Sequence, residues 1–461
     1  MAFFSVPDFS FRANCYNTGM TDDLQQYPVT VALPTLGCKA NRYDSDALAR
    51  ALIARGYRVV PEHAPADIYI VNTCTVTGGA DAKSRKLVRR AAREDGALVI
   101  VTGCAASLAG ETFTAISGVD AVVPLVEQDR LVEMVVRLRP PMSAVLPAQT
   151  GMGDPGTPPE SPITALSASA ARTRATVKVQ DGCNLHCAYC AVTLARGPLR
   201  SRPLEEILSE LRALTVAGVP EIVLTGIRLD AYGQEWPDTR LGDLLDATRA
   251  LPMPRLRLSS LEPMGITREL VAGMAVHPTL CRHFHLCLQS GDDNVLNAMR
   301  RGYTTAHFVE IIDGIRAVMP DATFTTDLIV GFPGETDAAF ANTLALVEQI
   351  GFIKLHIFKF SPRPGTAAAT MTPSVSEAVK DARSQALFAL ERQLFQRHAA
   401  RMVGVEVPVL VERSGPCGDG LTPHYLRVRA PFPSGSRGKI HRVCITGIGE
   451  DCLFSMTDIM E

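Results

Sequence analysis

The sequence lacks long apolar stretches and has almost no net charge, and each deficit excludes a class of protein. No run of 18 apolar residues occurs among its 461 residues, so a transmembrane helix is not expected. Its 46 Lys and Arg residues are balanced by 48 Asp and Glu residues, which argues against a protein that coats nucleic acid by bulk charge but permits a local basic patch. The N-terminus has no basic segment and contains Pro7 and Asp8, so it does not resemble a signal peptide. We expect a cytoplasmic protein with no membrane partner.

Cysteine, by contrast, is plentiful, with 12 residues. Disulfides are rare in large cytoplasmic proteins, so each cysteine is expected to be a core residue, a metal ligand or a nucleophile. Six of them form two regularly spaced groups. The other six have no pair spacing, and we interpret them as inert or as small apolar residues. They are Cys15, Cys281, Cys287, Cys417, Cys444 and Cys452.

Changes in composition along the chain predict five segments. Residues 140–162 contain seven prolines and three glycines with almost no large apolar side chains, so they cannot form a core and mark a linker. The expected segments are a flexible leader over 1–27, an N-terminal domain over 28–139, a Pro/Gly-rich linker over 140–170, a central domain over 171–400 and a C-terminal domain over 401–461.

Short apolar runs alternate with helical patterns in the N-terminal domain, which predicts an α/β fold with a parallel sheet. The strand-like runs cover 29–33, 67–72 and 97–103, and the helical patterns cover 44–56 and 80–94. Cys38, Cys74 and Cys104 each follow one of these runs. Because the ends of parallel strands share one edge of a sheet, the three thiols are expected to meet there.

The central and C-terminal domains show two further patterns. Six strand-like runs separated by amphipathic helices predict an incomplete (β/α) barrel with six strands. These runs cover 175–180, 221–226, 255–260, 283–290, 324–331 and 354–360. After a long helical pattern at 376–404, closely spaced Val, Ile, Gly and Pro predict a small β-barrel at the C-terminus.

The strongest motif is Cys183-Asn-Leu-His-Cys187-Ala-Tyr-Cys190, in a loop directly after a strand. Three thiolates at this spacing can wrap one small iron-sulfur centre. With three ligands for four irons, one iron stays open to another molecule. A zinc site is the alternative, but it requires a fourth ligand. His186 could supply it, but its place between two of the cysteine ligands is unfavourable.

This CxxxCxxC motif resembles that of the radical S-adenosylmethionine (SAM) superfamily. The resemblance implies a 4Fe-4S cluster held by the three cysteines, with SAM on its open iron as the source of a radical. The phrases TLGCKANRYDSD, VNTCTVTGGADAKSR and VTGCAA also resemble the N-terminal domain of the methylthiotransferases. That resemblance implies a second 4Fe-4S cluster on Cys38, Cys74 and Cys104. It covers residues 29–455 in the family's domain order and extends to a C-terminal barrel similar to the TRAM domain.

Within this family, Lys39, Asn41, the phrase CTVT and the run ARGPLRSRP are similar to the group that acts on threonylcarbamoyladenosine in tRNA. The resemblance implies methylthiolation of C2 of this nucleoside at position 37, with two SAM molecules, two 4Fe-4S clusters and an electron donor such as flavodoxin or ferredoxin. Isopentenyladenosine in tRNA and an aspartate of a ribosomal protein are alternative substrates. A non-catalytic iron-sulfur RNA-binding protein or redox sensor is the alternative from another class.

The resemblance also implies residues that hold SAM, most of them just after strands. They are Tyr189, Gly226, Ser260, Glu262, Gln289 and Asp327, with Ser290 and Gly331 as further candidates. A polar residue at a strand end can instead cap only a turn or a helix.

Three basic segments are candidate RNA contacts, although each is also explained by a solvated surface. The first lies past the CxxxCxxC motif, and we expect at least one of its arginines to bind tRNA phosphate or the carboxylate of a threonylcarbamoyl group. The second is rich in Arg with Tyr425 and Phe432 between, where we expect base stacking. The third is the helical pattern after Cys74. The segments comprise Arg196, Arg200 and Arg202; Arg427, Arg429, Arg437, Lys439 and Arg442; and Lys83, Arg85, Lys86, Arg89, Arg90 and Arg93.

Overall fold

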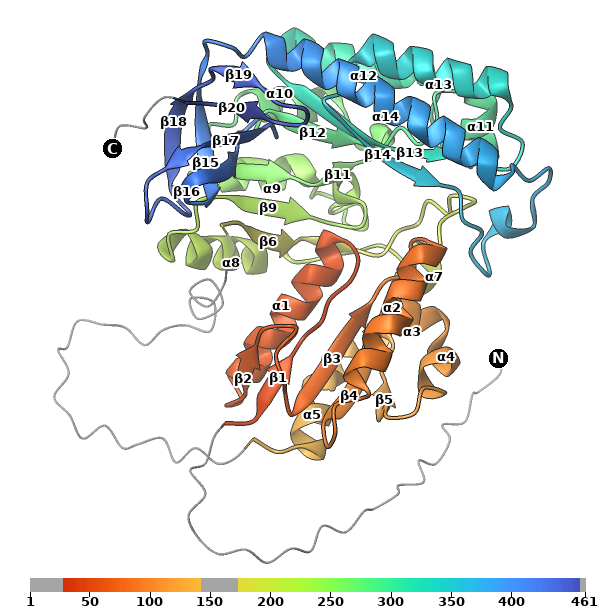
Figure 1. Ribbon diagram of the computed structural model, residues 1–461, viewed down its shortest axis with the longest axis vertical. Helices are drawn as coiled ribbons and strands as arrows, with labels where there is room; N and C mark the ends of the chain where they lie inside the picture. The colour runs from red at the N-terminus through yellow and green to blue at the C-terminus, as the bar shows by residue number, and fades with distance from the viewer. Residues whose placement is uncertain (1–27, 142–172, 457–461) are drawn as a thin grey trace, which may run out of the picture.

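The computed structural model describes residues 28–141 and 173–456. The predicted leader with Cys15, almost all of the predicted linker and residues 457–461 lie outside the described residues. Figure 1 shows the N-terminal domain below a larger central domain, with the C-terminal sheet packed at one end of the latter. Within the two described ranges, no helix is both long and apolar enough to cross a bilayer.

The N-terminal domain is a five-stranded sheet in the order β2-β1-β3-β4-β5, and all its pairings are parallel, as predicted. All six residues of β3 are buried, as expected for a strand covered on both faces. The two short edge strands β2 and β5 were not predicted. The elements are β1 (Thr30–Ala32), α1 (Lys39–Ile53), β2 (Arg58–Val60), β3 (Ile68–Thr73), α2 (Gly78–Ala91), β4 (Leu98–Gly103), α3 (Cys104–Leu108), α4 (Gly110–Thr114), β5 (Ala121–Val122), η1 (Leu125–Arg130) and α5 (Leu131–Leu138).

The central domain is the predicted incomplete barrel. Its parallel strands form two hydrogen-bonded groups, β10-β9-β6 and β11-β12-β13-β14. Only Ser259 separates β10 from β11, so six strand positions run from β6 to β14 without closing into a ring. The strands are β6 (Ala175–Lys178), β9 (Ile222–Thr225), β10 (Leu256–Leu258), β11 (Ser260–Leu261), β12 (His283–Leu286), β13 (Thr323–Val330) and β14 (Lys354–Lys359), with the hairpin strands β7 (Gln180–Asp181) and β8 (Arg200–Ser201). The helices are α7 (Val192–Arg196), α8 (Leu204–Val216), η2 (Leu229–Ala231), α9 (Leu241–Thr248), η3 (Pro263–Gly265), α10 (Arg268–Ala275), α11 (Asp293–Ala298), α12 (Thr305–Val318), α13 (Asp337–Ile350), η4 (Ala367–Thr370) and α14 (Glu377–Ala400).

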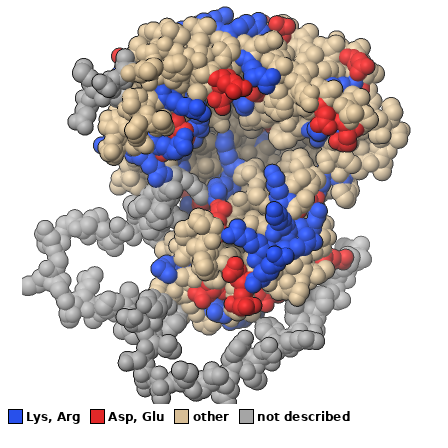
Figure 2. Space-filling view, viewed as in Figure 1, with Lys and Arg blue, Asp and Glu red and all other residues tan. Residues whose placement is uncertain are grey.

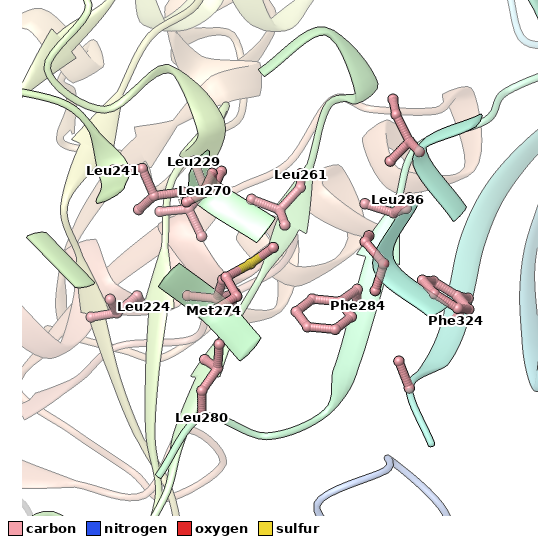
Figure 3. Close-up of a cluster of buried hydrophobic side chains, with 14 of the residues drawn as sticks. Leu224, Leu229, Leu241, Leu261, Leu270, Met274, Leu280, Phe284, Leu286 and Phe324 are labelled. Atoms are coloured by element: carbon pink, nitrogen blue, oxygen red, sulfur yellow. The ribbon is translucent and has the colours of Figure 1, made fainter. Parts of the chain in front are cut away.

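The core of this domain lies between the strands and the outer helices. Figure 3 shows Phe284 and Leu286 of β12 and Phe324 of β13 in one apolar cluster with Leu270 and Met274 of α10. Each such buried side chain stabilises the fold by about 1.5–3 kcal/mol. Because successive strand residues face opposite ways, the residues between these apolar ones face the inside of the barrel. That inner face carries the polar side chains described below.

The C-terminal domain is a curled sheet in the order β18-β15-β16-β17-β20-β19, consistent with the predicted small barrel. Its strands are β15 (Glu406–Arg413), β16 (Gly415–Leu421), β17 (Arg427–Phe432), β18 (Ile440–Cys444), β19 (Gly447–Ile448) and β20 (Leu453–Phe454). The turn between β16 and β17 packs on the start of the barrel strands. Arg257 donates to the Thr422 and Pro423 carbonyl oxygens at 3.1 Å each, and Tyr425 stacks on His283 with ring centroids 4.3 Å apart. The C-terminal domain therefore covers one end of the barrel.

Candidate functional site

The three N-terminal cysteines lie where the order of the sheet reverses. Cys38 precedes α1, Cys74 follows β3 and Cys104 begins α3. β1 and β3 are neighbours, and the carboxyl end of such a pair is where open α/β sheets bind ligands. Gly37 has φ +108°, and a Cβ placed on it would lie 3.1 Å from the Cys74 Sγ, so the loops are in close contact. The Cys104 thiol lies near both Cys38 and Cys74, as the sequence predicts.

Burial makes two of these three thiols poor nucleophiles in the absence of a metal, while Cys38 is exposed. Burial raises the pKa of Cys74, and it raises the pKa of Cys104 to about 12 despite the nearby Arg196 guanidinium. A protonated buried thiol does not attack a substrate, whereas a bound metal deprotonates its thiol ligands outright. A metal centre therefore suits Cys74 and Cys104 better than nucleophilic catalysis.

The second group lies in the loop between β7 and α7. Gly182 has φ +67°, and a Cβ there would lie 1.9 Å from the Pro198 carbonyl oxygen, so only glycine lets this loop pack. The Cys183 Sγ accepts from the Leu185 amide at 3.4 Å, and burial raises the pKa of Cys190 to about 12. His186 is exposed.

The zinc alternative has a geometric test. A single zinc ion holds its ligands at about 2.0–2.3 Å, so the ligand atoms would gather tightly. Among the described residues, the group gathered within 4.8 Å is His285, Asp327 and His356, and it includes none of the cysteines. The wider spacing of both cysteine groups fits a cluster of several irons.

A helix contact joins the two cysteine sites. α7 begins two residues after Cys190, and it packs on α3, whose first residue is Cys104. At the other end of α7, the Arg196 guanidinium lies within electrostatic reach of the Cys104 and Cys38 thiols. The two sites therefore adjoin across one domain boundary.

Arg301 is a site residue that the sequence analysis missed. Its guanidinium donates to the Cys187 Sγ at 3.2 Å, pairs with Glu262 and donates to the Cys287 carbonyl at 3.3 Å. Tyr189 is within electrostatic reach of both Arg301 and Glu262. The predicted SAM residues Tyr189 and Glu262 are thus brought together beside the cysteines by an arginine. Its only sequence signal is the pair of arginines before Gly302.

The remaining predicted SAM residues lie close to the expected places on the strands. Gly226 follows β9, Ser260 lies on β11, and Gln289 follows β12 with φ 65°, a left-handed conformation that is uncommon outside glycine. Asp327 lies within β13, the fifth strand, as expected, and it accepts from His356 Nδ1 at 3.1 Å and pairs with His285 Nε2 at 3.3 Å. Burial opposes its ionisation, but these two hydrogen bonds hold the pKa of Asp327 below its usual value.

Lys39 reaches this inner group from the N-terminal domain. It lies within electrostatic reach of Asp327, Arg257 and Arg174, and burial with the charge of Arg257 lowers the pKa of its amine to about 8. The residue belongs to an exposed segment with Gly37 and Cys38. Figure 2 shows basic side chains in the hollow between the N-terminal and central domains. The sequence analysis named Lys39 only because it is similar to the residue at this place in the enzymes that act on threonylcarbamoyladenosine.

Two of the three arginines expected at the substrate hold the domains together instead. Arg196 is 2 % exposed and pairs with Asp181 at 2.8 Å and with Asp44 of α1 at 2.9 Å. Arg202 donates to Glu210 at 2.8 Å, and Tyr43 of α1 donates to the same carboxylate at 2.9 Å. The prediction of a substrate contact is therefore wrong for Arg196, because its guanidinium is enclosed by protein carboxylates. Arg200 remains exposed.

The predicted basic surfaces differ in how many of their charges are free. Five of the six basic residues of this segment lie on α2 and Arg93 follows its end. Five of the six are exposed, and none pairs with a described carboxylate; Figure 2 shows this patch beside the hollow. In the C-terminal domain, Arg427 pairs with Asp419 at 2.9 Å, and Arg429 lies 3.9 Å from Asp451. Acidic partners from neighbouring strands thus neutralise charges that look unopposed in the sequence.

The aromatic residues of the C-terminal domain do not serve for base stacking as expected. Phe432 is 2 % exposed in the core of the sheet, and Tyr425 stacks on His283 with the Arg257 guanidinium 5.4 Å from its ring centroid. Of the non-ligand cysteines, Cys281, Cys287 and Cys452 are buried as predicted, Cys444 is half-buried and Cys417 is exposed.

Comparison with known proteins agrees with this geometry. Residues 177–347 match the radical SAM superfamily, and residues 30–124 match a family described as uncharacterized protein family UPF0004. In fold, the chain is similar to the radical SAM methyltransferase TsrM from Kitasatospora setae, with a TM-score of 0.54 and 16 % identity over 74 % of this chain and 75 % of that one.

Curated relatives cover almost the whole chain. It is 37 % identical to the threonylcarbamoyladenosine tRNA methylthiotransferase MtaB of Thermotoga maritima over 92 % of this chain and 96 % of that protein. It is 35 % identical to the MtaB of Bacillus subtilis over 91 % of this chain and 94 % of that protein. The chain therefore belongs to the radical SAM tRNA methylthiotransferase family.

Proposed function

We propose that this enzyme methylthiolates C2 of N6-threonylcarbamoyladenosine at position 37 of tRNA, using two 4Fe-4S clusters and two SAM molecules. The observation that carries the proposal is the joining of two three-cysteine sites across the α3–α7 contact. Two separate sites facing one substrate suit a reaction that needs both a radical source and a sulfur donor. The names of the relatives support the choice of nucleoside.

Membership of the radical SAM family makes SAM and a 4Fe-4S cluster cofactors of this enzyme. Cys183, Cys187 and Cys190 would hold that cluster, and Cys38, Cys74 and Cys104 would hold the second. When bound, SAM and its cluster supply radical chemistry that no side chain can provide. An electron donor of the flavodoxin or ferredoxin class would reduce the cluster.

The chain's own residues have positioning roles in this proposal. Arg301 holds Glu262 beside Cys187, which fixes a carboxylate where the amino group of SAM would bind. A Cβ placed on Gly226 would lie 2.9 Å from Gln180 Oε1, so only glycine lets this turn pack at the strand end where SAM would bind. Burial of Cys104 and Cys190 keeps water from the reacting centres.

tRNA would dock over the hollow between the N-terminal and central domains. The unpaired basic residues of α2 lie beside it (Figure 2), and they and the exposed Arg200 would contact RNA phosphates. The C-terminal domain would contribute Arg437 and Lys439, which are exposed and have no ion pair with a described residue, more than the neutralised Arg427 and Arg429.

The test is mass spectrometry of tRNA nucleosides from a strain that lacks this enzyme. We expect N6-threonylcarbamoyladenosine to accumulate at the expense of its 2-methylthio derivative, and expression of the chain to restore the latter. An unchanged threonylcarbamoyladenosine pool would overturn the choice of substrate, and a change in the isopentenyladenosine pool would favour that alternative. Reduced enzyme that forms no 5′-deoxyadenosine from SAM would favour a non-catalytic iron-sulfur protein.

A further inference from the structure

Two histidines and one aspartate form a group on the inner face of the barrel, and the proposed reaction gives this group no role. His285 belongs to β12, Asp327 to β13 and His356 to β14. One ligand atom from each side chain lies within 4.8 Å of the other two. Two imidazoles and one carboxylate are a ligand set that proteins use for Zn²⁺ and for Fe²⁺.

The register of three neighbouring strands brings the group together. In the parallel pairing of β13 and β14, Asp327 lies opposite His356, and in the pairing of β12 and β13, Thr325 lies opposite His285. Thr325 and Asp327 are two positions apart on β13, so their side chains share one face of the sheet. The core residues on either side of His285 face the outer helices, so the shared face is the inside of the barrel. Strands hold side chains more precisely than loops do.

The distances within the group match those between the ligands of one metal ion. The Asp327 Oδ1 atom lies 3.1 Å from His356 Nδ1 and 3.3 Å from His285 Nε2. Ligands that lie about 2.0–2.1 Å from a tetrahedral zinc ion are roughly 3.3–3.5 Å apart. An ion at this place would bind the ring nitrogens that face Asp327, and each neutral imidazole would carry its proton on the other nitrogen.

A further hydrogen bond holds His285 in the orientation that a metal ligand needs. The Thr325 hydroxyl lies 2.9 Å from His285 Nδ1 and 3.0 Å from His283 Nε2. Metal-bound histidines almost always donate the N–H of their other nitrogen to a fixed acceptor, which sets the tautomer and the orientation of the ring. Because a hydroxyl both accepts and donates, Thr325 can accept from His285 while it donates to His283.

The charge and the exposure of the group both suit an ion. Hydrogen bonds from the two histidines hold the pKa of Asp327 below its usual value, so the group carries one negative charge. The exposed fraction of the side chains rises from 9 % at His285 through 26 % at Asp327 to 40 % at His356, so an ion can enter from the side of β14. The charge of Lys39 lies within electrostatic reach and opposes the ion, but within the described ranges the ion pairs of Asp327 are with the two histidines.

We infer that His285, Asp327 and His356 bind one divalent transition-metal ion, Zn²⁺ or Fe²⁺, at a site separate from both cysteine groups. Three protein ligands leave a coordination position for water or for an oxygen atom of a substrate, as in catalytic zinc sites. Asp327 then binds this ion instead of SAM. The inference does not depend on which nucleoside the enzyme modifies.

The test is metal analysis of the full chain after anaerobic reconstitution of both clusters, so that iron occupies the cysteines. After incubation with Zn²⁺ and gel filtration, we expect one zinc per wild-type chain in addition to about eight irons, the sum for two four-iron clusters. Asp327→Asn and His356→Ala should each lose this zinc and retain the irons. If the site already holds Fe²⁺, wild type will contain about nine irons, and Asp327→Asn will contain about eight.

Two kinds of variant distinguish a built site from chance binding. Thr325→Val removes the hydroxyl that holds His285 and keeps the branched shape of the side chain, so it should weaken zinc binding about 10- to 100-fold in competition with a chelator. His63→Ala, at an exposed histidine between β2 and β3, and Cys417→Ser, at an exposed cysteine, should both retain the zinc.

Two results would overturn the inference. One is a wild-type enzyme that holds no ion beyond those of its clusters, and the other is an extra ion that Asp327→Asn retains. Either result would leave the proposed function intact, because neither the clusters nor the choice of nucleoside depends on this site.

Discussion

Cys74 and Cys183 are alike as buried or half-buried thiols, but their neighbours assign them different roles. Cys183 lies in one loop with Cys187 and near Glu262, at the proposed SAM site. Cys74 lies across the domain boundary with Cys38 and Cys104. Loss of either ligand should therefore stop a different part of the reaction.

We predict that Cys183→Ala abolishes cleavage of SAM, because the radical-forming cluster loses a ligand. Cys74→Ala should leave SAM cleavage near the wild-type rate while abolishing the methylthio product. The measurement is anaerobic quantification of 5′-deoxyadenosine and of modified nucleoside after reaction with a stem-loop RNA. Cys417→Ser, at an exposed cysteine, should leave both unchanged. If both alanine variants cleaved SAM normally, the two-site assignment would be wrong.

At this scale, spacing predicts chemistry well where the residues are close in sequence or at equivalent strand ends. Both cysteine groups were identified in this way. Spacing cannot predict contacts between residues that come from remote segments of the chain. Arg196 meets Asp44, 152 positions away, and Tyr425 meets His283 of another domain. An unpaired appearance in the sequence is therefore no guide to whether a charge or an aromatic ring is free.

Of the three basic segments that are candidate RNA contacts, the one on α2 has the most exposed basic residues without an acidic partner among the described residues. Its N-cap Thr77 accepts from the Ala80 amide at 3.1 Å, and Gly78 donates its amide to the Ser361 hydroxyl at 3.0 Å. The helix is therefore anchored at the end nearest Cys74, with its basic side chains free.

We predict that replacing Lys83, Lys86 and Arg89 together by Gln weakens binding of tRNA and reduces the slope of log K against log salt by about 2. Each lost phosphate contact removes its share of the counterion release. Titrations at several salt concentrations measure the slope. Arg397→Gln, at an exposed arginine of α14 that pairs with Glu348, should leave it unchanged. An unaltered slope in the triple variant would exclude α2 from the RNA interface.

α14 carries a pH-sensitive group at its contact with the C-terminal domain. Burial, with the charges of His424 and Arg401, lowers the pKa of His398 from 6.5 to about 4. In the unfolded chain this histidine binds a proton as the pH falls below 6.5, whereas in the folded chain it stays neutral until about pH 4. Protonation therefore favours the unfolded chain, and stability falls as the pH drops through this window.

We predict that His398→Gln reduces the loss of stability between pH 7.5 and 5.5. The measurement is the shift in the midpoint of urea unfolding between these two pH values, compared with wild type. His63→Gln, at an exposed histidine between β2 and β3, serves as the control and should behave as wild type. An identical shift in His398→Gln and wild type would show that this histidine does not titrate with folding.

In the whole molecule, the N-terminal domain is fastened to both edges of the open barrel. Asp44 of α1 pairs with Lys178 and Arg196 on the β6 side. Near the other edge, Arg363 pairs with Asp81 of α2 and donates to the Thr75 hydroxyl at 2.7 Å. The domain thus spans the gap between the first and last strands.

We predict that Asp44→Asn destabilises the enzyme by about 3–5 kcal/mol, because Lys178 and Arg196 would then share Asp181 alone and one positive charge at the domain boundary would be uncompensated. Glu62→Gln removes an exposed partner of Arg42 in the same domain and should cost about 0–1 kcal/mol. Urea unfolding of both variants gives the comparison. Equal effects would mean that the Asp44 contacts do not hold the domains together.

The sequence predicted the order and class of all three domains, because each has a distinct periodicity. The way in which they meet could not be predicted. It depends on which carboxylate faces which cation across an interface, and periodicity carries no such information.

The turn at Tyr425 ties the C-terminal domain to the interior of the barrel. Tyr425 stacks on the buried His283 of β12, and Arg257 of β10 donates to two carbonyl oxygens of the same turn. A chimera that receives the C-terminal domain of a related enzyme must therefore keep this turn. Without it, His283 and Arg257 would lose their partners and the barrel itself would be destabilised.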